Sequence, residues 1–332
     1  MSLFPRHSRE TGELCYGFGD IWISGVSVGR GVHPDWRDRD SVLFLGADEP
    51  GLYVAFRTRN WQPERLSREP FSLLACGNGR YAVWHATSGI KTNDGEIYPD
   101  GFVPAMNADG ALAFLANPTS PEQTLYLIAG DNRIVIDDGA SLFSPSLSRQ
   151  GLVWTKLMDG RFTTYGWRAS VGTVQGLQAS WSPEFDPVVV DTPDGPWILG
   201  HDDAQRLFLY PWGRTLGIVV EQGVTYNPDA IWLNGGFHVA WTDAINRIVQ
   251  RFVPYNALRR DLSVPTAAPP PIVAPMPRRL FFGPFFGSGA EPGNCFHYKI
   301  EANVGVFRFA DGRAFATYIE GGDVEIIRTR LL

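Results

Sequence analysis

The chain has 332 residues, of which 44% are hydrophobic and 13% aromatic, enough to bury a large core. Its net charge of −6 includes no basic block, which argues against nucleic acid as the main ligand because phosphate neutralisation needs clustered Lys and Arg. The 36 glycines and 25 prolines favour many short strands joined by turns.

The N-terminal segment MSLFPRHSRE has no apolar run of the kind that marks a secretory signal, and no stretch reaches membrane-spanning length. We therefore expect neither ordinary export nor membrane insertion. Cys15, Cys76 and Cys295 form an odd set without CxxC spacing. This pattern favours unpaired thiols made in a reducing compartment.

A proline recurs in the same local sequence along the chain. Pro104, Pro145, Pro187 and Pro228 are spaced by 41, 42 and 41 residues, and each is followed by a glycine and a short apolar run. Two looser copies begin at His33 and at Glu69. A period near 40 with strand-turn-strand content predicts an all-β fold, a β-propeller with one blade per repeat. We expect six blades, with seven as the alternative.

Each repeat divides into four expected strands. The proline begins the innermost strand, where a missing N–H is tolerated. The glycine turn leads to a second strand, and a polar turn leads to a third, with an outermost strand after that. Residues 14–28 alternate like a strand pair and are expected to close the ring beside the last blade. Trp84, Trp154, Trp167 and Trp241 are expected to pack between blades.

Three regions follow from this pattern. Residues 1–262 are expected to form the propeller, with the N-terminal strands closing it. Residues 263–277 contain six prolines and predict an extended linker. Residues 278–332 read as a small β module, with Asp-Gly and Gly-Gly turns, for docking or oligomerisation.

Loops that enter the inner strands and loops that join second to third strands meet at one face of a propeller, and binding residues collect on such loops. Acidic residues near aromatic ones form a surface suited to carbohydrate. The candidate ligand-binding residues on this face are Trp36, Tyr98, Asp100, Trp181, Glu184, Asp186, His201, Asp202, Asp203, Asn227 and Asp243. Acidic turn residues are also common simply because Asp and Asn suit turns.

No catalytic motif stands out, and we predict no catalytic residue, no metal site and no cofactor. HExxH, P-loop and GxGxxG patterns are absent. His201-Asp202-Asp203 is the single tripeptide that hints at a metal site, and a surface turn explains it as well. Two carboxylates facing each other across the channel would instead indicate a glycoside hydrolase or lyase, with Asp186 the clearest candidate.

The repeat unit, a proline followed by a glycine, an aromatic residue and a strand, resembles the six-bladed repeats of TolB-like propellers over residues 33–253. The proline-rich segment running into RRLFFGPFFGSGAEPGNCFHY resembles tail-associated proteins of bacteriophages. That resemblance implies a virion component, made in the host cytoplasm, that touches host surface structures. It also implies several copies of the chain in one assembly.

Two classes of function remain open from the sequence. The first is a non-enzymatic propeller that recognises a surface glycan or a receptor protein, with residues 278–332 attaching it to other virion subunits. The second is a hydrolase or lyase with carboxylates at the channel mouth. A third interpretation is an intracellular scaffold that binds a protein partner through the same face.

Overall fold

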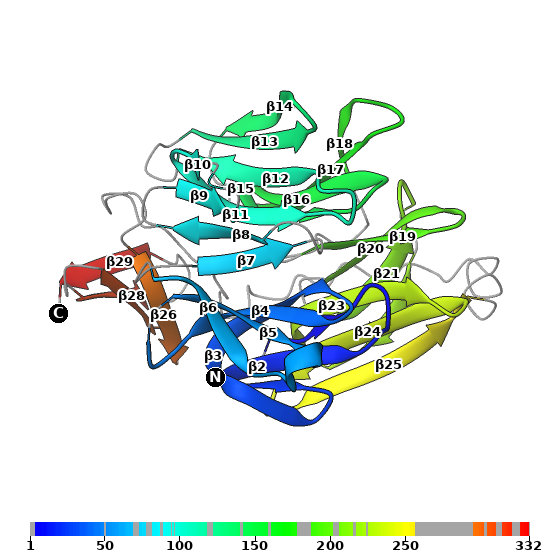
Figure 1. The fold of residues 1–332 in the computed structure, drawn as a ribbon. Helices are drawn as coiled ribbons and strands as arrows, with labels where there is room; N and C mark the ends of the chain where they lie inside the picture. The colour runs from blue at the N-terminus through cyan, green and yellow to red at the C-terminus, as the bar shows by residue number, and fades with distance from the viewer. Residues whose placement is uncertain are drawn as a thin grey trace.

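The computed structural model describes residues 4–49, 51–68, 73–77, 82–86, 89–93, 95, 97–117, 122–139, 142–158, 161–177, 187–201, 206–214, 217–223, 225–255, 295–301, 304–309, 314–320 and 326–331. Antiparallel strands dominate these residues (Figure 1). One turn of 3-10 helix, η1, spans Arg57–Arg59.

The first sheet has six strands in the order β1-β2-β3-β4-β5-β6. Their bounds are β1 Arg6–His7, β2 Leu14–Ile23, β3 Val26–Asp38, β4 Ser41–Gly46, β5 Leu52–Phe56 and β6 Pro63–Ser67. The long strand β3 pairs with β2 through its first half and with β4 through its second half. The strand pair expected at residues 14–28 forms as β2 and the start of β3. The expectation that it would complete the last blade is wrong, since it pairs within the first sheet.

Five further sheets follow in the described residues up to Pro254, and we call these five and the first sheet blades 1 to 6. Blade 2 contains β7 Leu73–Gly77, β8 Ala82–Ala86, β9 Gly89–Thr92 and β10 Ile97–Tyr98. Blade 3 contains β11 Gly101–Met106, β12 Leu112–Ala116, β13 Gln123–Ala129 and β14 Asn132–Gly139. Blade 4 contains β15 Leu142–Leu147, β16 Gly151–Met158, β17 Arg161–Arg168 and β18 Val174–Gly176. Blade 5 contains β19 Val188–Thr192, β20 Gly195–His201, β21 Leu207–Pro211 and β22 Ile218–Glu221. The described strands of blade 6 are β23 Thr225–Leu233, β24 Gly236–Asp243 and β25 Ile248–Pro254.

The inner strands of these blades form a ring. β3 contacts β7, and contacts continue through β11, β15 and β19 to β23. The short strand β1 contacts both β23 and β3, so it lies between the last blade and the first. Figure 1 shows these two blades side by side. The fold is a β-propeller, as the repeat predicts.

The repeated proline marks a bulge in the inner strand. The register shifts between Val32 and Asp35 in blade 1, and equivalent shifts flank Pro104, Pro145 and Pro228. The residue before each of these prolines has a positive φ: His33 at 51°, Val103 at 50°, Ser144 at 47° and Asn227 at 47°. A bulge adds a residue and bends its strand, which explains why the same local sequence returns in these four blades. In blade 5, Pro187 directly precedes β19, whose pairing with β20 has no register shift.

The core lies between neighbouring blades. Trp154 is fully buried with Phe102 and Leu125 of blade 3, and its indole N–H donates to Asp137 Oδ2 at 2.9 Å. Trp241 of blade 6 is buried in one cluster with Trp197 of blade 5. The prediction that Trp154 and Trp241 pack between blades is confirmed; the side chain of Trp84 lies outside the described residues.

Hydrogen bonds between turns join blades at the spacing of the repeat. Asn107 Nδ2 donates to the carbonyl of Ser148 at 3.2 Å, from blade 3 to blade 4. Gln150 Nε2 donates to the carbonyl of Thr192 at 3.2 Å, from blade 4 to blade 5. The backbone N–H of Arg149 donates to the carboxylate of Asp191 at 2.9 Å. These bonds fix the turns of blades 3 to 5 relative to one another.

Residues 263–277, the predicted linker, lie outside the described residues. The C-terminal region contributes one four-stranded antiparallel sheet, which includes the predicted meander. Its strands are β26 Cys295–Glu301, β27 Val304–Phe309, β28 Ala314–Glu320 and β29 Ile326–Leu331.

Candidate functional site

The propeller has two faces with different loops. Because adjacent strands of a blade are antiparallel, the turns after first and third strands lie at one face. We call this the pocket face. The loops that enter the inner strands and the turns from second to third strands lie at the other, which we call the entry face. The sequence analysis looks for binding residues on the entry face.

Five of the predicted binding residues lie outside the described residues. These are Trp181, Glu184, Asp186, Asp202 and Asp203. The other six can be placed in the structure.

Trp36 lies within β3 and not on an entering loop, since the inner strand of blade 1 continues to Asp38, four residues past Pro34. It is buried and its ring meets that of Trp61 edge-on, with centroids 6.1 Å apart. Its indole N–H donates to the carbonyl of Arg6 at 3.0 Å. The contacts of Trp36 therefore join the N-terminal segment to blade 1.

His201 and Asp243 lie at the ends of second strands, at the entry face, and both have internal partners. His201 is buried, and its Nε2 lies 2.6 Å from Thr225 Oγ1 at the start of blade 6. Asp243 accepts the backbone N–H groups of Ile245 and Arg247 and the Nε–H of Arg247. The backbone N–H of Arg247 is the largest influence that lowers the pKa of this carboxyl group. Asp243 closes its turn, and His201 links two blades.

Tyr98 ends the outer strand β10, Asn227 lies within the inner strand β23, and Asp100 lies on the loop between β10 and β11. The ring of Tyr98 packs against Phe114, with centroids 5.3 Å apart. Asp100 is exposed and has a φ of 59°, and its carbonyl accepts the N–H of Asn117 at 3.1 Å. The structure describes no pocket that brings these three residues together.

The sequence analysis missed two inner-strand carboxylates, Asp35 and Asp229. Each directly follows a bulge proline, and both lie next to the N-terminal segment. The N–H of His7 donates to Asp229 Oδ2 at 2.7 Å, and His7 Nδ1 lies 2.8 Å from the same oxygen. This pair joins β1 to β23 at the boundary between the last blade and the first, which we call the seam of the ring.

The two carboxyl groups differ in their pKa values. Burial raises the pKa of Asp35 to about 6, although Arg6 and Arg9 act in the opposite direction. Burial also raises the pKa of Asp229, but the hydrogen bonds and charge of His7, with Arg6, outweigh it and leave that pKa below 3.8. Asp229 is therefore ionised in a place where His7 compensates its charge.

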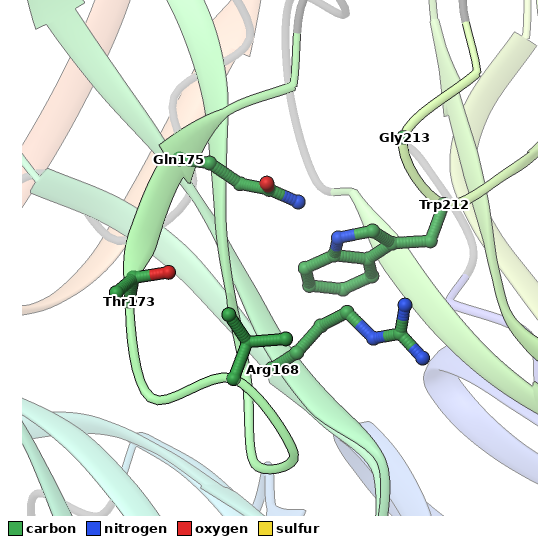
Figure 2. A pocket seen from close by; sticks show the side chains of 6 residues that line it. Arg168, Thr173, Gln175, Trp212 and Gly213 are labelled. Carbon is green, nitrogen blue, oxygen red and sulfur yellow. The ribbon is translucent and has the colours of Figure 1, made fainter.

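On the pocket face, a cavity of about 200 Å³ opens between blades 4 and 5 (Figure 2). Its lining comes from the turn and outer strand after β17 and from the turn after β21. The lining residues are Arg168, Val171, Thr173, Gln175, Trp212 and Gly213.

Local sequence explains how Trp212 reaches this cavity. Pro211 to Arg214 form a turn, closed by the N–H of Arg214 donating to the carbonyl of Pro211 at 3.1 Å. Gly213 has a φ of 73°, which favours glycine at the third position of such a turn. The N–H of Trp212 donates to the carbonyl of Pro196 at 3.0 Å. The indole is thereby held across the boundary with blade 4.

A glycine in blade 4 makes room for the indole. A Cβ atom on Gly166 would lie 2.5 Å from Cζ2 of Trp212 and 2.7 Å from Cδ1 of Leu177. Glycine inside a strand often marks the close approach of another group. The sequence TYGWR therefore contains the one signal from which this contact could be suspected.

Two donors in the cavity wall have no acceptor. Trp212 is 9% exposed, and its Nε1 is buried without a hydrogen-bond partner. Arg168 Nε is likewise buried without a partner, and the described residues provide no ion pair for its guanidinium group. Figure 2 shows the guanidinium beside the indole, with the amide of Gln175 directed toward the indole nitrogen. A buried donor without a partner costs about 1–3 kcal/mol, so an acceptor placed in this cavity would be bound favourably.

Within the described ranges, no three His, Cys, Asp or Glu side chains lie close enough together to hold a metal ion. The same ranges contain no helix of the length and apolar character needed to cross a membrane. Cys15 and Cys76 are buried free thiols.

Comparisons with known proteins show the fold. No protein-family model and no curated protein matches the chain. Among solved structures, it is similar to a chain of the mitotic checkpoint complex, with a TM-score of 0.54, 10% identity, and coverage of 76% of this chain and 89% of that one. It is also similar to the β-propeller domain of Cps50 (Swd1) from Myceliophteria thermophila, with a TM-score of 0.53, 13% identity and coverage of 76% and 97%. Hsv2 from Kluyveromyces lactis gives a TM-score of 0.51, 11% identity and coverage of 75% and 96%. At these identities the likeness shows that the chain has a β-propeller fold, and it shows no more than that.

Proposed function

We propose that this protein is a non-catalytic β-propeller that binds a protein partner through its pocket face, over blades 4 and 5. The observation that carries the proposal is the cavity beside Trp212, where two donors are buried without acceptors. Such groups are rare in folded proteins, and each calls for an explanation. Occupation by a partner explains both of them together.

The surroundings of the cavity suit a protein surface. Val171 and Val174 on the β17–β18 hairpin are 62% and 40% exposed, and they add an apolar rim to the polar wall. An apolar patch beside unsatisfied polar groups is typical of a contact surface. The mitotic checkpoint complex chain, to which the fold is similar, belongs by its name to a protein assembly. That similarity makes a protein partner a reasonable first choice.

A narrower form of the proposal concerns the biological setting. In it, the chain is a TolB-like six-bladed propeller in a phage tail, it recognises a host-surface glycan or protein, and residues 278–332 attach it to other subunits. Its support is the resemblance of the repeat and of the proline-rich segment. Removing residues 278–332 is then expected to stop incorporation into virions. Normal incorporation of the shortened chain would count against this form.

Asp35 and Asp229 could be considered as the acid and base of a hydrolase, because their pKa values are shifted in opposite directions. However, one oxygen of Asp229 already accepts the N–H of His7 and contacts its ring. Trp36 and the β1 segment are packed beside the same strands. These contacts support a structural role at the seam, so binding is the better-supported proposal.

The proposal is tested by measuring how well immobilised wild-type protein and two immobilised variants retain a partner. Arg168→Gln alters the cavity, whereas Arg30→Gln is a matched change at an exposed ion pair with Asp48 on blade 1. We expect a partner, quantified by mass spectrometry, to be retained by wild type and Arg30→Gln and to be lost with Arg168→Gln. Equal retention by all three proteins would contradict the proposed site. Turnover of surface polysaccharides by the wild type would contradict a non-catalytic role.

A further inference from the structure

We infer that the cavity between blades 4 and 5 binds a peptide carboxylate, either a C-terminus or an acidic side chain. The inference rests on the proposed function and names the chemistry of its ligand. It begins from the donors in the wall, because a ligand must supply what they lack.

The two buried groups can only donate hydrogen bonds. An indole Nε1–H has no acceptor capacity, and neither has a guanidinium group. Thr173 and Gln175, which also line the cavity, add side chains that can donate. A ligand that fits this wall therefore presents several acceptors, and a carboxylate presents two oxygens.

Charge leads to the same ligand. Arg168 has no carboxylate partner in the part of the chain that the structure describes, and it is the one charged residue among the described residues that line the cavity. A single guanidinium group matches the single charge of a carboxylate, and such charge-assisted hydrogen bonds are about twice as strong as neutral ones. A phosphate dianion would leave excess negative charge at this site.

Size restricts the ligand further. The cavity of about 200 Å³ is smaller than the roughly 300–1,000 Å³ typical of drug-sized ligand sites. It suits one amino-acid residue better than an oligosaccharide or a nucleotide. The indole face and Val171 add apolar surface for the remainder of that residue.

Access to the indole nitrogen requires a small movement. Nε1 of Trp212 and Nε of Arg168 have almost no solvent contact. Gln175 is exposed, and its amide lies in front of the indole nitrogen (Figure 2). Rotation of this side chain would expose the donor to an entering oxygen, as surface side chains commonly do on binding.

The ¹⁵N–¹H signal of the Trp212 indole provides the test, since it can be assigned by its loss in Trp212→Phe. The full chain is titrated with acetyl-Ala-Ala-Val carrying a free carboxylate, the same peptide as an amide, acetyl-Ala-Glu-Ala-amide, and glucuronate. We expect a saturable shift with at least one of the two carboxylate peptides and affinity at least about tenfold weaker for the acetyl-Ala-Ala-Val amide. Which carboxylate peptide binds distinguishes a C-terminus from an acidic side chain.

Arg168→Gln should abolish the shift, and Arg168→Lys, which keeps the charge but loses the planar fork, should weaken it. The inference is overturned if the amide binds as well as the acid, if glucuronate binds best, if the shift survives Arg168→Gln, or if no probe shifts the Trp212 signal. If no probe shifts the Trp212 signal, the retention experiment still tests the proposed partner-binding function. Failure of the carboxylate inference can therefore be distinguished from failure of the proposed function.

Discussion

His7 and Asp229 lie 222 residues apart in the chain, yet the N–H and Nδ1 of His7 both lie within 2.8 Å of one carboxylate oxygen of Asp229. The His7 side chain is 2% exposed and that of Asp229 is 14% exposed. The pair fastens the N-terminal strand to the last blade and so contributes to closing the ring.

Asp229→Asn is expected to lower the free energy of unfolding by about 2 kcal/mol, because it removes a charge-assisted contact from a buried site. Urea denaturation at pH 7 measures this change. Asp48→Asn is the matched control, since it breaks an exposed ion pair with Arg30 and should cost less than about 1 kcal/mol. Equal effects of the two substitutions would show that the seam contact does not stabilise the fold.

The low pKa of Asp229 makes this contribution depend on pH. A carboxyl group whose pKa is lower in the folded state stabilises the fold above its unfolded pKa, here 3.8. The difference between wild type and Asp229→Asn should therefore be constant near neutral pH and should shrink as the pH falls below 3.8. An unchanged difference at low pH would exclude an ionised Asp229 in the native protein.

Ionisation of Asp35 should change the stability of the fold with pH in the opposite direction to that of Asp229. Its pKa is raised from 3.8 to about 6, so the folded state binds this proton more tightly than the unfolded state does. Stability should therefore fall as the pH rises from about 4 to about 6, by on the order of 3 kcal/mol. Asp35→Asn should remove this dependence and should be the more stable protein at pH 7. Thermal unfolding of both proteins from pH 4 to pH 8 measures it, and parallel curves would contradict the burial of this carboxyl group.

The bulge residues before the repeated prolines should respond to substitution according to their backbone conformation. Asn tolerates a positive φ better than a β-branched residue does. Asn227→Val, at a φ of 47°, should cost about 1–2 kcal/mol. Val103→Asn, at a φ of 50°, should relieve strain and change stability by less than about 1 kcal/mol, because Val103 also packs against the core. If Val were tolerated at position 227, the strain argument would fail.

Gly166→Ala should destabilise the boundary between blades 4 and 5 by about 1–3 kcal/mol, because the new methyl group would meet Trp212 at 2.5 Å. Gly176→Ala in the same blade is the control, since its nearest neighbour would be Tyr165 Cε1 at 3.9 Å. Melting temperatures measure both effects. A neutral Gly166→Ala would mean that the indole does not rest on this strand.

The repeat in the sequence predicts much of the fold. The spacing of Pro104, Pro145 and Pro228 locates inner strands because each of these prolines lies at a bulge in its strand. Local turn chemistry locates the strands that follow. These features depend on residues close together in the chain, which a single sequence can reveal.

The seam and the cavity depend on contacts between distant residues. Nothing near His7 or Asp229 in the sequence signals that the two will meet. Trp212 and Gly166 belong to different blades, and only the glycine in the strand hints that something large approaches. Residue type and expected loop position single out the entry-face candidates Trp36, His201 and Asp243, and neither reveals that each has an internal partner.

A photo-crosslinking residue placed on each face shows whether a protein partner binds at the pocket face. Benzoylphenylalanine at position 171 reports on the pocket face. The same residue at position 245, between the second and third strands of blade 6, reports on the entry face. Val171 and Ile245 are 62% and 68% exposed. We expect position 171 to crosslink a partner, and we expect this crosslink to disappear when Arg168 is changed to Gln. Position 245 should give no crosslinked partner. Crosslinks from position 245 alone, or from position 171 regardless of Arg168, would contradict binding of the partner at the cavity on the pocket face.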